Sequence, residues 1–378
     1  MTRIRLLILA ATAFLSACAP LPRPNPHSVA VRVTFDRDRI TSVQARGAGA
    51  DDPVRVASIS KLITDIGAMR LVEAGILDLD ADVSSVLGWP LRNPHFPDRP
   101  ITLRLLLSHR SGLKDDVDYA IPLGQTLQTT LSDPKAWDAE HAPGTFFRYG
   151  NINFPVVASI MEKATGERFD TLMARLVFKP LRIDACFNWT TCSDAAVARA
   201  VTLKSEAGAV RRDDLRGRRP DCPVLSPGPG CDLSGYVPGT NGALFSPQGG
   251  ARISAAGLAR IGQFLLRQGE GLLAPGIIAA MIGPEWVFNG GNGDTEKGFW
   301  CAYGLAVQTL AASQACRNDP FGDGVRRLGH SGEAYGLRSG LWVDPVRGRG
   351  VAYFVTAVPD DAPKGRSGFT RTEEQMVR

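Results

Sequence analysis

The sequence predicts an α+β fold in which strands from both ends of the chain share one antiparallel sheet and the middle of the chain is mainly helical. Three observations support this prediction. Residues 28–35 alternate between apolar and polar side chains, which is the period of a half-buried strand. From Ser58 onward, apolar residues recur every three or four positions, as on an amphipathic helix. Two short apolar runs, 340–343 and 351–358, lie close together near the end of the chain and predict adjacent antiparallel strands.

The first half of the chain contributes a hairpin and then helices. A second strand over 40–45 completes a hairpin with the first strand. The helix that starts at Ser58 reaches Gly75, a residue type that commonly ends helices. Residues 101–190 show mainly helical spacing, and we expect an inserted, mostly helical subdomain over about 96–234.

The second half returns to the sheet after a long loop. Residues 205–250 are rich in Gly, Pro and Arg and predict a loop, in which a run of five arginines is expected to be merely solvated: Arg211, Arg212, Arg216, Arg218 and Arg219. Helical spacing resumes over 254–267. A helical pattern begins again within 369–378 and soon stops, so a terminal helix would be short. One folded domain is therefore expected over 28–378.

Composition excludes several classes of protein. The chain has 378 residues, of which 44% are hydrophobic and 21% charged, as in ordinary globular proteins. The net charge of +5 is spread along the chain, so the basic face that a nucleic-acid-binding protein needs is missing. No apolar run reaches the ~18 residues of a membrane span.

The N-terminus has the layout of an export signal. In residues 1–17, Arg3 and Arg5 precede a short apolar stretch, which predicts a signal peptide. The small residues before Cys18 resemble the lipobox of bacterial lipoproteins, which implies cleavage before Cys18 and a lipid anchor on its thiol. Plain secretion with cleavage near Ala17 is the alternative. Either way we expect a periplasmic location in the bacterial cell envelope, and residues 18–27, with four prolines, predict a stiff tether.

Six further cysteines suggest disulfides, because an even number in an exported chain usually forms pairs. Fifteen pairings are possible for six cysteines. The pairing of nearest neighbours needs only local loop closure and is ranked first: Cys186–Cys192, Cys222–Cys231 and Cys301–Cys316. Buried free thiols are the alternative. No metal or organic cofactor is expected, since metal-binding motifs such as C-x-x-C and H-E-x-x-H are missing.

Ser58 and Lys61 form an S-x-x-K motif at the start of the predicted helix. The spacing places both side chains on one face of the helix, one turn apart. A serine hydroxyl becomes a nucleophile when a base removes its proton, and a lysine can do so if burial lowers its pKa. Taken alone, the motif fits equally well an N-capping serine followed by a solvent-facing lysine.

Two further motifs strengthen the catalytic interpretation. Tyr149 and Asn151 follow a Pro-Gly-Thr turn and supply a phenol for proton transfer and an amide for orienting Lys61 or a carbonyl group. His330, Ser331 and Gly332 lie just before the apolar run at 340 and are expected to contact the substrate, with Gly332 letting a substrate backbone approach a strand.

The backbone N–H of Glu333 would complete an oxyanion hole with that of Ser58. Each of these motifs also occurs in ordinary turns, and only their joint order is informative.

The motifs in this order make residues 29–358 similar to the serine beta-lactamase-related superfamily, especially class C beta-lactamases, DD-peptidases, and related esterases and D-aminopeptidases. Four further stretches support the resemblance: residues 56–61, 107–113, 143–145 and 245–250. It implies a beta-lactamase-like α+β fold with Ser58 as the acylated nucleophile. Lys61 and Tyr149 would form the general base system, and Asn151 would orient the acyl group.

The sequence departs from the family at one position that matters for substrate. His330 stands where lactamases and many carboxypeptidases have a lysine that pairs with a substrate carboxylate. A histidine is largely neutral at pH 7, so this anchor is weakened and penicillin hydrolysis becomes doubtful. Arg338 could supply the positive charge of the missing lysine, but the simpler expectation is that Arg338 is an ordinary surface residue. His109 is expected to be structural, and three alternating aspartates are expected to be exposed in a turn: Asp78, Asp80 and Asp82.

The resemblance implies a serine hydrolase that works through an acyl-enzyme on small esters or amides, D-amino-acid peptides included. A DD-carboxypeptidase or weak class C-like lactamase is the first alternative. A non-catalytic binding module of the cell envelope is the second.

Overall fold

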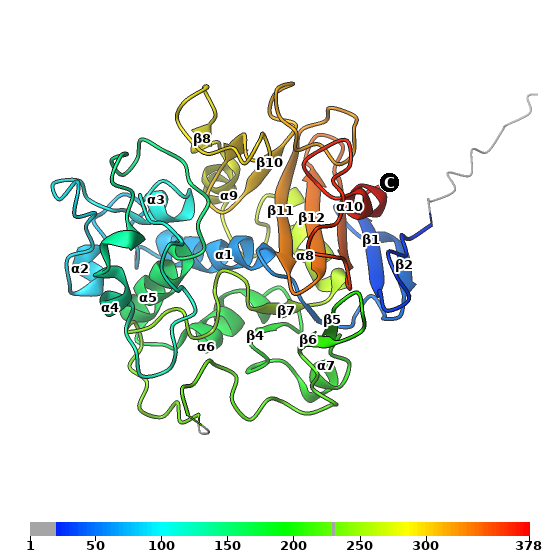
Figure 1. Cartoon of the computed structure of the whole chain (residues 1–378), viewed down its shortest axis with the longest axis horizontal. Coiled ribbons are helices and arrows are strands. Elements are labelled where there is room, and N and C mark those ends of the chain that lie inside the picture. Colours follow the sequence, from blue (N-terminus) through cyan, green and yellow to red (C-terminus); the bar gives the residue numbers. More distant parts are fainter. Residues whose placement is uncertain (1–19, 229–230) are drawn as a thin grey trace, which may run out of the picture.

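An eight-stranded antiparallel sheet forms one side of the molecule in the computed structural model, which describes residues 20–228 and 231–378 (Figure 1). Its strand order brings the two ends of the chain together, because β1 pairs with β13 from Ala30↔Val355 to Asp36↔Arg349. The predicted sheet of N- and C-terminal strands is thus confirmed. From one edge to the other the strands are β2 (Ile40–Arg46), β1 (Ala30–Asp36), β13 (Arg349–Val355), β12 (Leu337–Asp344), β11 (Arg327–Ala334), β10 (Gln308–Leu310), β9 (Ala302–Tyr303) and β8 (Trp286–Val287).

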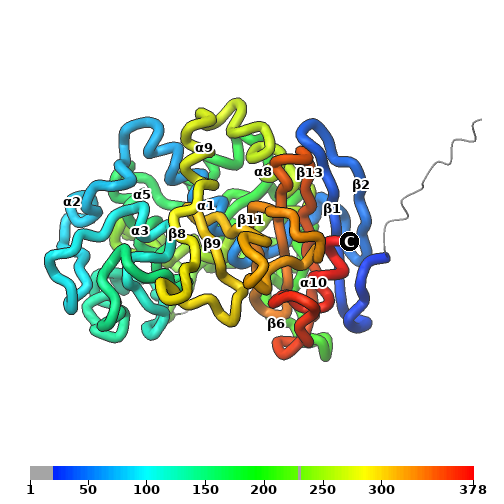
Figure 2. The backbone as a smooth tube through the Cα atoms, turned by 90° about the horizontal axis from the view of Figure 1, so that it is seen from above, coloured from blue at the N-terminus to red at the C-terminus, as the bar shows by residue number. Residues whose placement is uncertain are grey.

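Helices cover both faces of this sheet. α8 (Ala255–Leu266) lies on one face against β1, β12 and β13, and α10 (Arg371–Met376) lies on the other (Figure 2). Under α10, Trp342 of the sheet packs with Phe369 and Met376. The terminal helix has six residues and is as short as expected.

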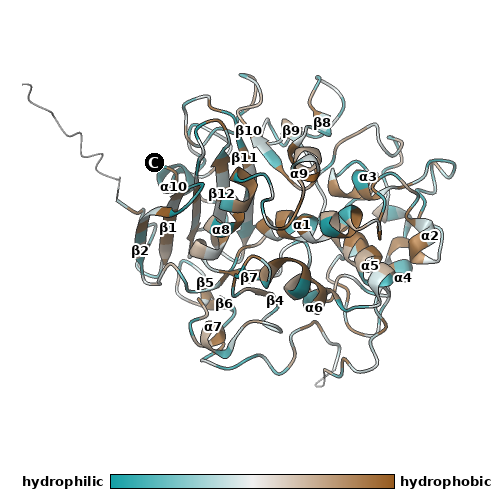
Figure 3. Ribbon diagram, turned by 180° about the vertical axis from the view of Figure 1, so that it is seen from behind, coloured by the Kyte–Doolittle hydropathy of each residue, from teal (hydrophilic) through white to brown (hydrophobic). Residues whose placement is uncertain are grey.

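Burial along the strands explains why they form this layer. The side chains of β1 are almost entirely buried, whereas β2 at the edge is mostly exposed, and the two strands differ accordingly in hydropathy (Figure 3). β12, which has neighbours on both sides and helices on both faces, is buried at every position. Such a strand shows a continuous apolar run rather than alternation, as the sequence at 340–343 does.

α1 (Ile59–Glu73) runs from the sheet into the helical part of the molecule (Figure 1). It is buried along most of its length, which includes polar positions such as Lys61 and Asp65. The helix ends at Glu73 with Ala74 as its C-cap, and Gly75 follows with φ 68°, in the left-handed conformation that glycine adopts most easily. The helix predicted from Ser58 to Gly75 is confirmed.

The middle of the chain contains less helix than expected. Between residues 84 and 178 every helical element except the 13-residue α5 has at most five residues: α2 (Ser84–Leu87), α3 (Leu103–Leu107), α4 (Leu127–Leu131), the 3-10 turn Pro134–Ala136, α5 (Asn153–Thr165), α6 (Phe169–Met173) and the π-helical turn Ala174–Phe178. Leu-rich segments such as 103–107 supply apolar faces that pack together without forming long helices.

The rest of the chain consists of small elements around α1 and the sheet. Two small sheets are β3 (Val54–Arg55), β7 (Ala251–Ile253) and β4 (Cys186–Phe187), and β5 (Leu203–Lys204) with β6 (Val210–Arg212). The remaining helices are α7 (Asp194–Ala198) and α9 (Pro275–Ile282). The described residues of the segment 205–250, which are 205–228 and 231–250, form loop as predicted, apart from β6.

The predicted signal peptide and Cys18 lie outside the described residues. The described part of the proline-rich segment lies against the domain instead of standing away from it, since Arg46 donates to the carbonyl of Pro22 at 2.6 Å. The Asn25 side chain also donates to the carbonyl of Ala357. Among residues 20–228 and 231–378, no helix is long and apolar enough to cross a membrane.

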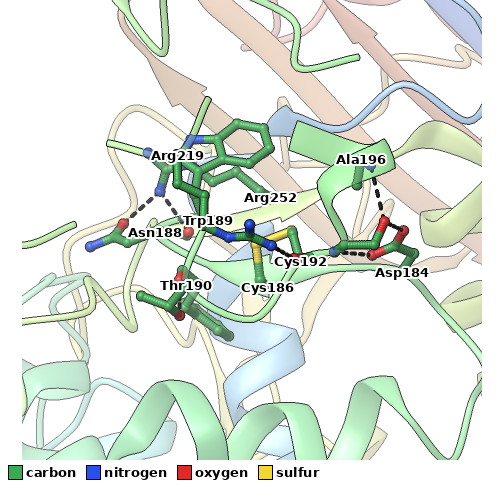
Figure 4. Close-up of a disulfide and its surroundings, with 12 residues drawn as sticks. Asp184, Cys186, Asn188, Trp189, Thr190, Cys192, Ala196, Arg219 and Arg252 are labelled. Atoms are coloured by element: carbon green, nitrogen blue, oxygen red, sulfur yellow. Dashed lines mark hydrogen bonds between the residues drawn. A yellow bond between two sulfur atoms is a disulfide. The ribbon is translucent and has the colours of Figure 1, made fainter. Parts of the chain in front are cut away.

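Three disulfides join the pairs ranked first from the sequence: Cys186–Cys192, Cys222–Cys231 and Cys301–Cys316. Each closes a loop of at most 15 residues. The first of them lies beside Trp189 and Arg252, close to the small sheet that supports the start of α1 (Figure 4).

The packing of α8 on the sheet gives a test of the fold. A Cβ added at Gly262 would lie 2.2 Å from the Phe35 ring, whereas one added at Gly276 of α9 would meet no atom within 4 Å. We expect Gly262→Ala to lower the free energy of unfolding by about 1–3 kcal/mol, because extra volume strains a packed core. Gly276→Ala is the matched control and should leave it unchanged or slightly higher. Equal effects of both substitutions in urea unfolding would contradict this packing.

Candidate active site

Ser58 lies at the start of α1, on the floor of a cleft of about 870 Å³. The chain enters the helix through Ala57, whose φ of 49° is rare for a residue with a side chain. This turn presents the Ser58 hydroxyl to the cleft. The Ser58 backbone N–H also belongs to the helix N-terminus, where the first N–H groups lack intrahelical acceptors.

Lys61 lies one turn into α1, and its ammonium group is directed at Ser58. Its Nζ is 3.1 Å from Ser58 Oγ, 2.8 Å from Asn151 Oδ1 and 3.0 Å from the carbonyl oxygen of Gln248. The side chain has no solvent exposure. Of the two interpretations of the S-x-x-K motif, the solvent-facing lysine is therefore wrong.

Burial gives Lys61 the pKa of a useful base. It lowers the pKa of Lys61 to about 7, while the negative charge of Asp115 acts in the opposite direction. An isolated ammonium is costly to bury, so the neutral amine is favoured more than in water.

Asn151 holds Lys61 because Asp115 fixes its amide. The Asp115 carboxylate accepts hydrogen bonds from Asn151 Nδ2 at 3.0 Å and from the Asn151 backbone N–H at 2.7 Å. It also accepts one from the backbone N–H of Ile152 at 2.9 Å. With Nδ2 bound to Asp115, the amide oxygen must face Lys61.

Tyr149 completes the group of side chains around Ser58. Its ring stacks on Trp300 at 4.4 Å between centroids, and Lys61 Nζ lies 4.8 Å from its centre. Burial raises the pKa of Tyr149, and a hydrogen bond with Ser58 lowers it by a smaller amount. The phenol is therefore protonated at neutral pH.

His330 is placed differently from the expectation that it contacts substrate. It has no solvent exposure on β11 and does not line the cleft. Its Nδ1 lies 2.6 Å from the carbonyl oxygen of Ser331, so Nδ1 carries the proton and Nε2 accepts from the Tyr303 hydroxyl at 2.8 Å. Burial and the nearby Lys61 lower the pKa of His330 to about 3. This histidine is neutral and cannot pair with a carboxylate.

The next three residues of β11 form a wall of the cleft. Ser331, Gly332 and Glu333 all line it. A Cβ at Gly332 would lie 2.3 Å from the carbonyl oxygen of Val56, so glycine is needed here for the close approach of β11 to the start of α1. Gly332 thus admits the chain's own segment before Ser58, and its approach to a substrate backbone in the cleft stays a prediction.

Burial corrects the expectation for Arg338 and is consistent with the one for His109. Arg338 is not a surface residue: it is 2% exposed, does not line the cleft, and forms an ion pair with Glu333 at 2.8 Å. His109 is buried and accepts from the backbone N–H of Gly150 at 3.2 Å, next to Tyr149, which fits a structural role.

The aspartates at 78, 80 and 82 belong to a turn, with ion pairs from Asp80 to Arg104 and from Asp82 to Arg92. Within the described ranges, no cluster of three or more His, Cys, Asp or Glu residues could hold a metal ion.

Two residues of this network were not assigned from the sequence. Asp115 belongs to a loop without a motif, and no sequence signal identifies it. Gln248 lies in the stretch 245–250 that supported the family resemblance, but its contribution is a backbone carbonyl, which no side-chain pattern reveals.

Comparison with known proteins supports the family suggested by these motifs. The model of the Beta-lactamase family matches residues 27–369. The chain belongs to this family. Over 203 residues it is 30% identical to the lovastatin esterase of Penicillium rubens, covering 47% of the chain and 45% of that protein. Over 147 residues it is 29% identical to penicillin-binding protein 4 of Amycolatopsis lactamdurans, covering 37% and 38%. The chain thus spans less than half the length of these curated relatives.

Solved structures show the same fold at low identity. EstCE1, titled a hydrolase with promiscuous acyltransferase activity, aligns with a TM-score of 0.66 and 22% identity, covering 92% of both chains. The D-amino acid amidase from Ochrobactrum anthropi SV3 aligns with a TM-score of 0.65 and 18% identity, covering 93% of this chain and 92% of that one. The beta-lactamase-like fold predicted from the sequence is therefore confirmed.

The site predicts a pH dependence. Below pH 7 Lys61 is an ammonium and cannot accept a proton, so kcat/KM for a neutral ester should fall about tenfold per pH unit and reach a plateau above pH 7. Because Asp115 raises the pKa of Lys61, Asp115→Asn should move this acid limb to lower pH.

Asp116→Asn is the matched control, since Asp116 is exposed and forms an ion pair with Lys114. The pH profiles of kcat/KM for the three proteins provide the measurement. A limb that does not move in Asp115→Asn, or that moves equally in both variants, would refute the electrostatic argument.

Proposed function

We propose that this chain is a serine hydrolase that transfers an acyl group to Ser58 and then to water. The observation that supports this most directly is the buried Lys61 amine, hydrogen-bonded to Ser58 Oγ at 3.1 Å and with its pKa lowered to about 7. A buried lysine directed at a serine in an open cleft is costly for stability and useful for removing the serine proton.

The contacts of Lys61 define the direction of proton transfer. Asn151 Oδ1 and the Gln248 carbonyl are acceptors only, so two of the N–H groups of Lys61 donate to them in either protonation state. The third position faces Ser58 Oγ. In the neutral amine this position holds the lone pair, which accepts the Ser58 proton as Oγ attacks the substrate carbonyl carbon.

Tyr149 serves as the proton donor in this proposal. Its phenol is protonated at neutral pH and hydrogen-bonded to Ser58, so it can pass a proton to the leaving oxygen or nitrogen as the bond to the acyl carbon breaks. The proton taken by Lys61 then restores the phenol. Water hydrolyses the Ser58 ester by the reverse sequence and releases the acid.

The oxyanion would be held by the backbone N–H groups of Ser58 and Glu333. Both residues line the cleft, and Gly332 brings the strand that carries Glu333 against the segment before Ser58. Loss of one such donor typically costs about 10²–10³-fold in rate.

Small esters and amides, D-amino-acid peptides included, are the proposed substrates. The relatives named as an esterase and as a D-amino acid amidase are consistent with this class. The neutral, buried His330 disfavours a DD-carboxypeptidase or lactamase that binds a carboxylate at this position. A binding module whose Ser58 is never acylated would not need a lysine with a lowered pKa, whereas one that is acylated without turnover is distinguished by the labelling experiment below.

We also propose that Cys18 carries a lipid that anchors the domain to a membrane of the bacterial cell envelope, on the periplasmic side. Support comes from the sequence of residues 1–18 and from the three disulfides, which persist in oxidising compartments.

Labelling with a fluorophosphonate probe tests the nucleophile. We expect the wild-type protein to be labelled and to hydrolyse p-nitrophenyl butyrate, and Ser58→Ala to do neither. Ser85→Ala is the matched control, because Ser85 is an exposed serine of α2. Lys61→Met should reduce kcat/KM by about 10²–10⁴-fold, the usual contribution of a general base. Equal labelling of Ser58→Ala and wild type would refute the proposal, and labelling without turnover would favour the binding module.

Cell fractionation tests the anchor. We expect the full-length protein, expressed in a bacterium with lipoprotein processing, to fractionate with membranes, and Cys18→Ala to appear in the soluble periplasmic fraction. If both proteins are soluble in the periplasm, the alternative of plain secretion is correct.

A further inference from the structure

We propose that the cleft contains an anion subsite, formed by Arg55 and Arg212 around Tyr335, that binds a carboxylate of the substrate. The proposal deepens the function proposed above and rests on Ser58 being the nucleophile. It assigns the carboxylate anchor, which His330 cannot provide, to a different wall of the same cleft.

The subsite begins with two arginines that face each other across the small sheet. Arg55 of β3 is paired with Arg252 of β7. Side chains directly opposite in an antiparallel pair lie about 4.5–5.5 Å apart at Cβ, and like charges there repel. Such a pair is stable only when counter-charges or hydrogen bonds satisfy its members.

Arg252 is fully satisfied. It forms a salt bridge with Asp213 at 2.9 Å and donates to Asn188 Oδ1 at 2.6 Å and to the carbonyl of Gly250 at 2.7 Å (Figure 4). Its guanidinium also lies over the Trp189 ring. Each of its three guanidinium nitrogens already donates to an acceptor of the protein, which indicates a structural role.

Arg55 is not satisfied. Within residues 20–228 and 231–378 its guanidinium has no hydrogen bond or ion pair, and its Nε is buried without an acceptor. Its Cζ lies 5.2 Å from the centre of the Tyr335 ring, and Asp213, which is bound to Arg252, acts on it only through its charge. Burial and the nearby Arg252 lower the pKa of Arg55 to about 10. A bound anion would relieve both effects.

Tyr335 and Arg212 extend the subsite. Tyr335 and Gly336 form the two-residue turn between β11 and β12, with φ of 54° and 75°, an unusual conformation for a tyrosine. The turn places the Tyr335 ring between two cations, since Arg212 Cζ lies 4.8 Å from it and Arg212 donates to the Tyr335 hydroxyl at 3.1 Å. Although burial alone would raise the pKa of Tyr335, Arg55 and Arg212 lower it overall.

This cluster shares the cleft with the nucleophile. Arg55, Arg212 and Tyr335 line the same cleft as Ser58. Arg55 Nη2 lies near Gly249, the residue after Gln248, whose carbonyl holds Lys61. A substrate that occupies the cleft can therefore reach both Ser58 and the guanidinium of Arg55.

A carboxylate is the anion that fits this arrangement. A guanidinium presents two parallel N–H groups that match the two oxygens of a carboxylate. In a small ester or amide, this carboxylate can belong either to the acyl group or to the leaving group. We therefore expect the protein to prefer substrates that carry one carboxylate over their neutral analogues.

Matched ester pairs test the subsite on both sides of the scissile bond. On the acyl side, mono-p-nitrophenyl glutarate is compared with p-nitrophenyl pentanoate. On the leaving-group side, the butyryl ester of 4-hydroxybenzoate is compared with that of 4-hydroxybenzamide. We expect the wild-type protein to prefer the anionic member of at least one pair by tenfold or more in kcat/KM.

Arg55→Gln should reduce this anionic-to-neutral ratio by at least tenfold, mainly through a higher KM, and Arg55→Lys by less. Arg212→Gln should reduce it by a smaller factor, because Arg212 is exposed. The control is Arg349→Gln at the far end of β13, which should leave the ratio unchanged.

Two outcomes would overturn the subsite: no preference for the anionic esters, or an Arg55→Gln variant that loses activity equally on both members of each pair. Turnover of the neutral esters that depends on Ser58 separates these failures from a failure of the proposed hydrolase itself.

Discussion

The buried amine of Lys61 is the constraint on which the active site depends. An amine without solvent exposure needs acceptors in fixed positions, and the chain supplies one from Asn151 and one from the backbone at Gln248. These acceptors come from segments about 90 and 187 residues away, so the helical part and the small sheet must both be in place before the amine is satisfied. Catalytic geometry and folding are thus coupled through one side chain.

Much of this arrangement could be predicted from the sequence, because it depends on local patterns. Ser58 and Lys61 are three residues apart on a helix, so their proximity follows from helical geometry. The strands at the two chain ends follow from apolar runs. The mainly helical spacing predicted for residues 101–190 is consistent with α3 and α5, but the bounds of the other short helices could not be located, since leucine-rich loops and helices with similar composition look alike until their packing is known.

Long-range electrostatics explain why parts of the site could not be predicted. His330 is predicted to contact substrate, yet burial and Lys61 lower its pKa, and its orientation depends on Tyr303, 27 residues away in sequence. Arg212 was expected to be solvated with its neighbours, and only the turn at Tyr335 shows that it faces the cleft. The different roles of Arg55 and Arg252 could not be predicted either. The two arginines face each other in the small sheet, and only the structure shows that Asp213 pairs with Arg252.

The same reasoning explains a buried carboxyl group one turn below Lys61. Asp65 follows Lys61 by four residues, which places it on the same face of α1. Among the described residues neither of its carboxyl oxygens has a hydrogen-bond partner, and burial raises the pKa of Asp65 well above its usual range.

If Asp65 were ionised, its negative charge would favour the ammonium form of Lys61 and raise the pKa of the base. Burial favours the neutral acid form of Asp65 and so opposes this effect, and the pKa of Lys61 is governed mainly by its own burial, with Asp115 acting in the opposite direction. In the proposed mechanism, burial around α1 thus acts in one direction on both groups, because it favours the neutral amine of Lys61 and the neutral acid of Asp65.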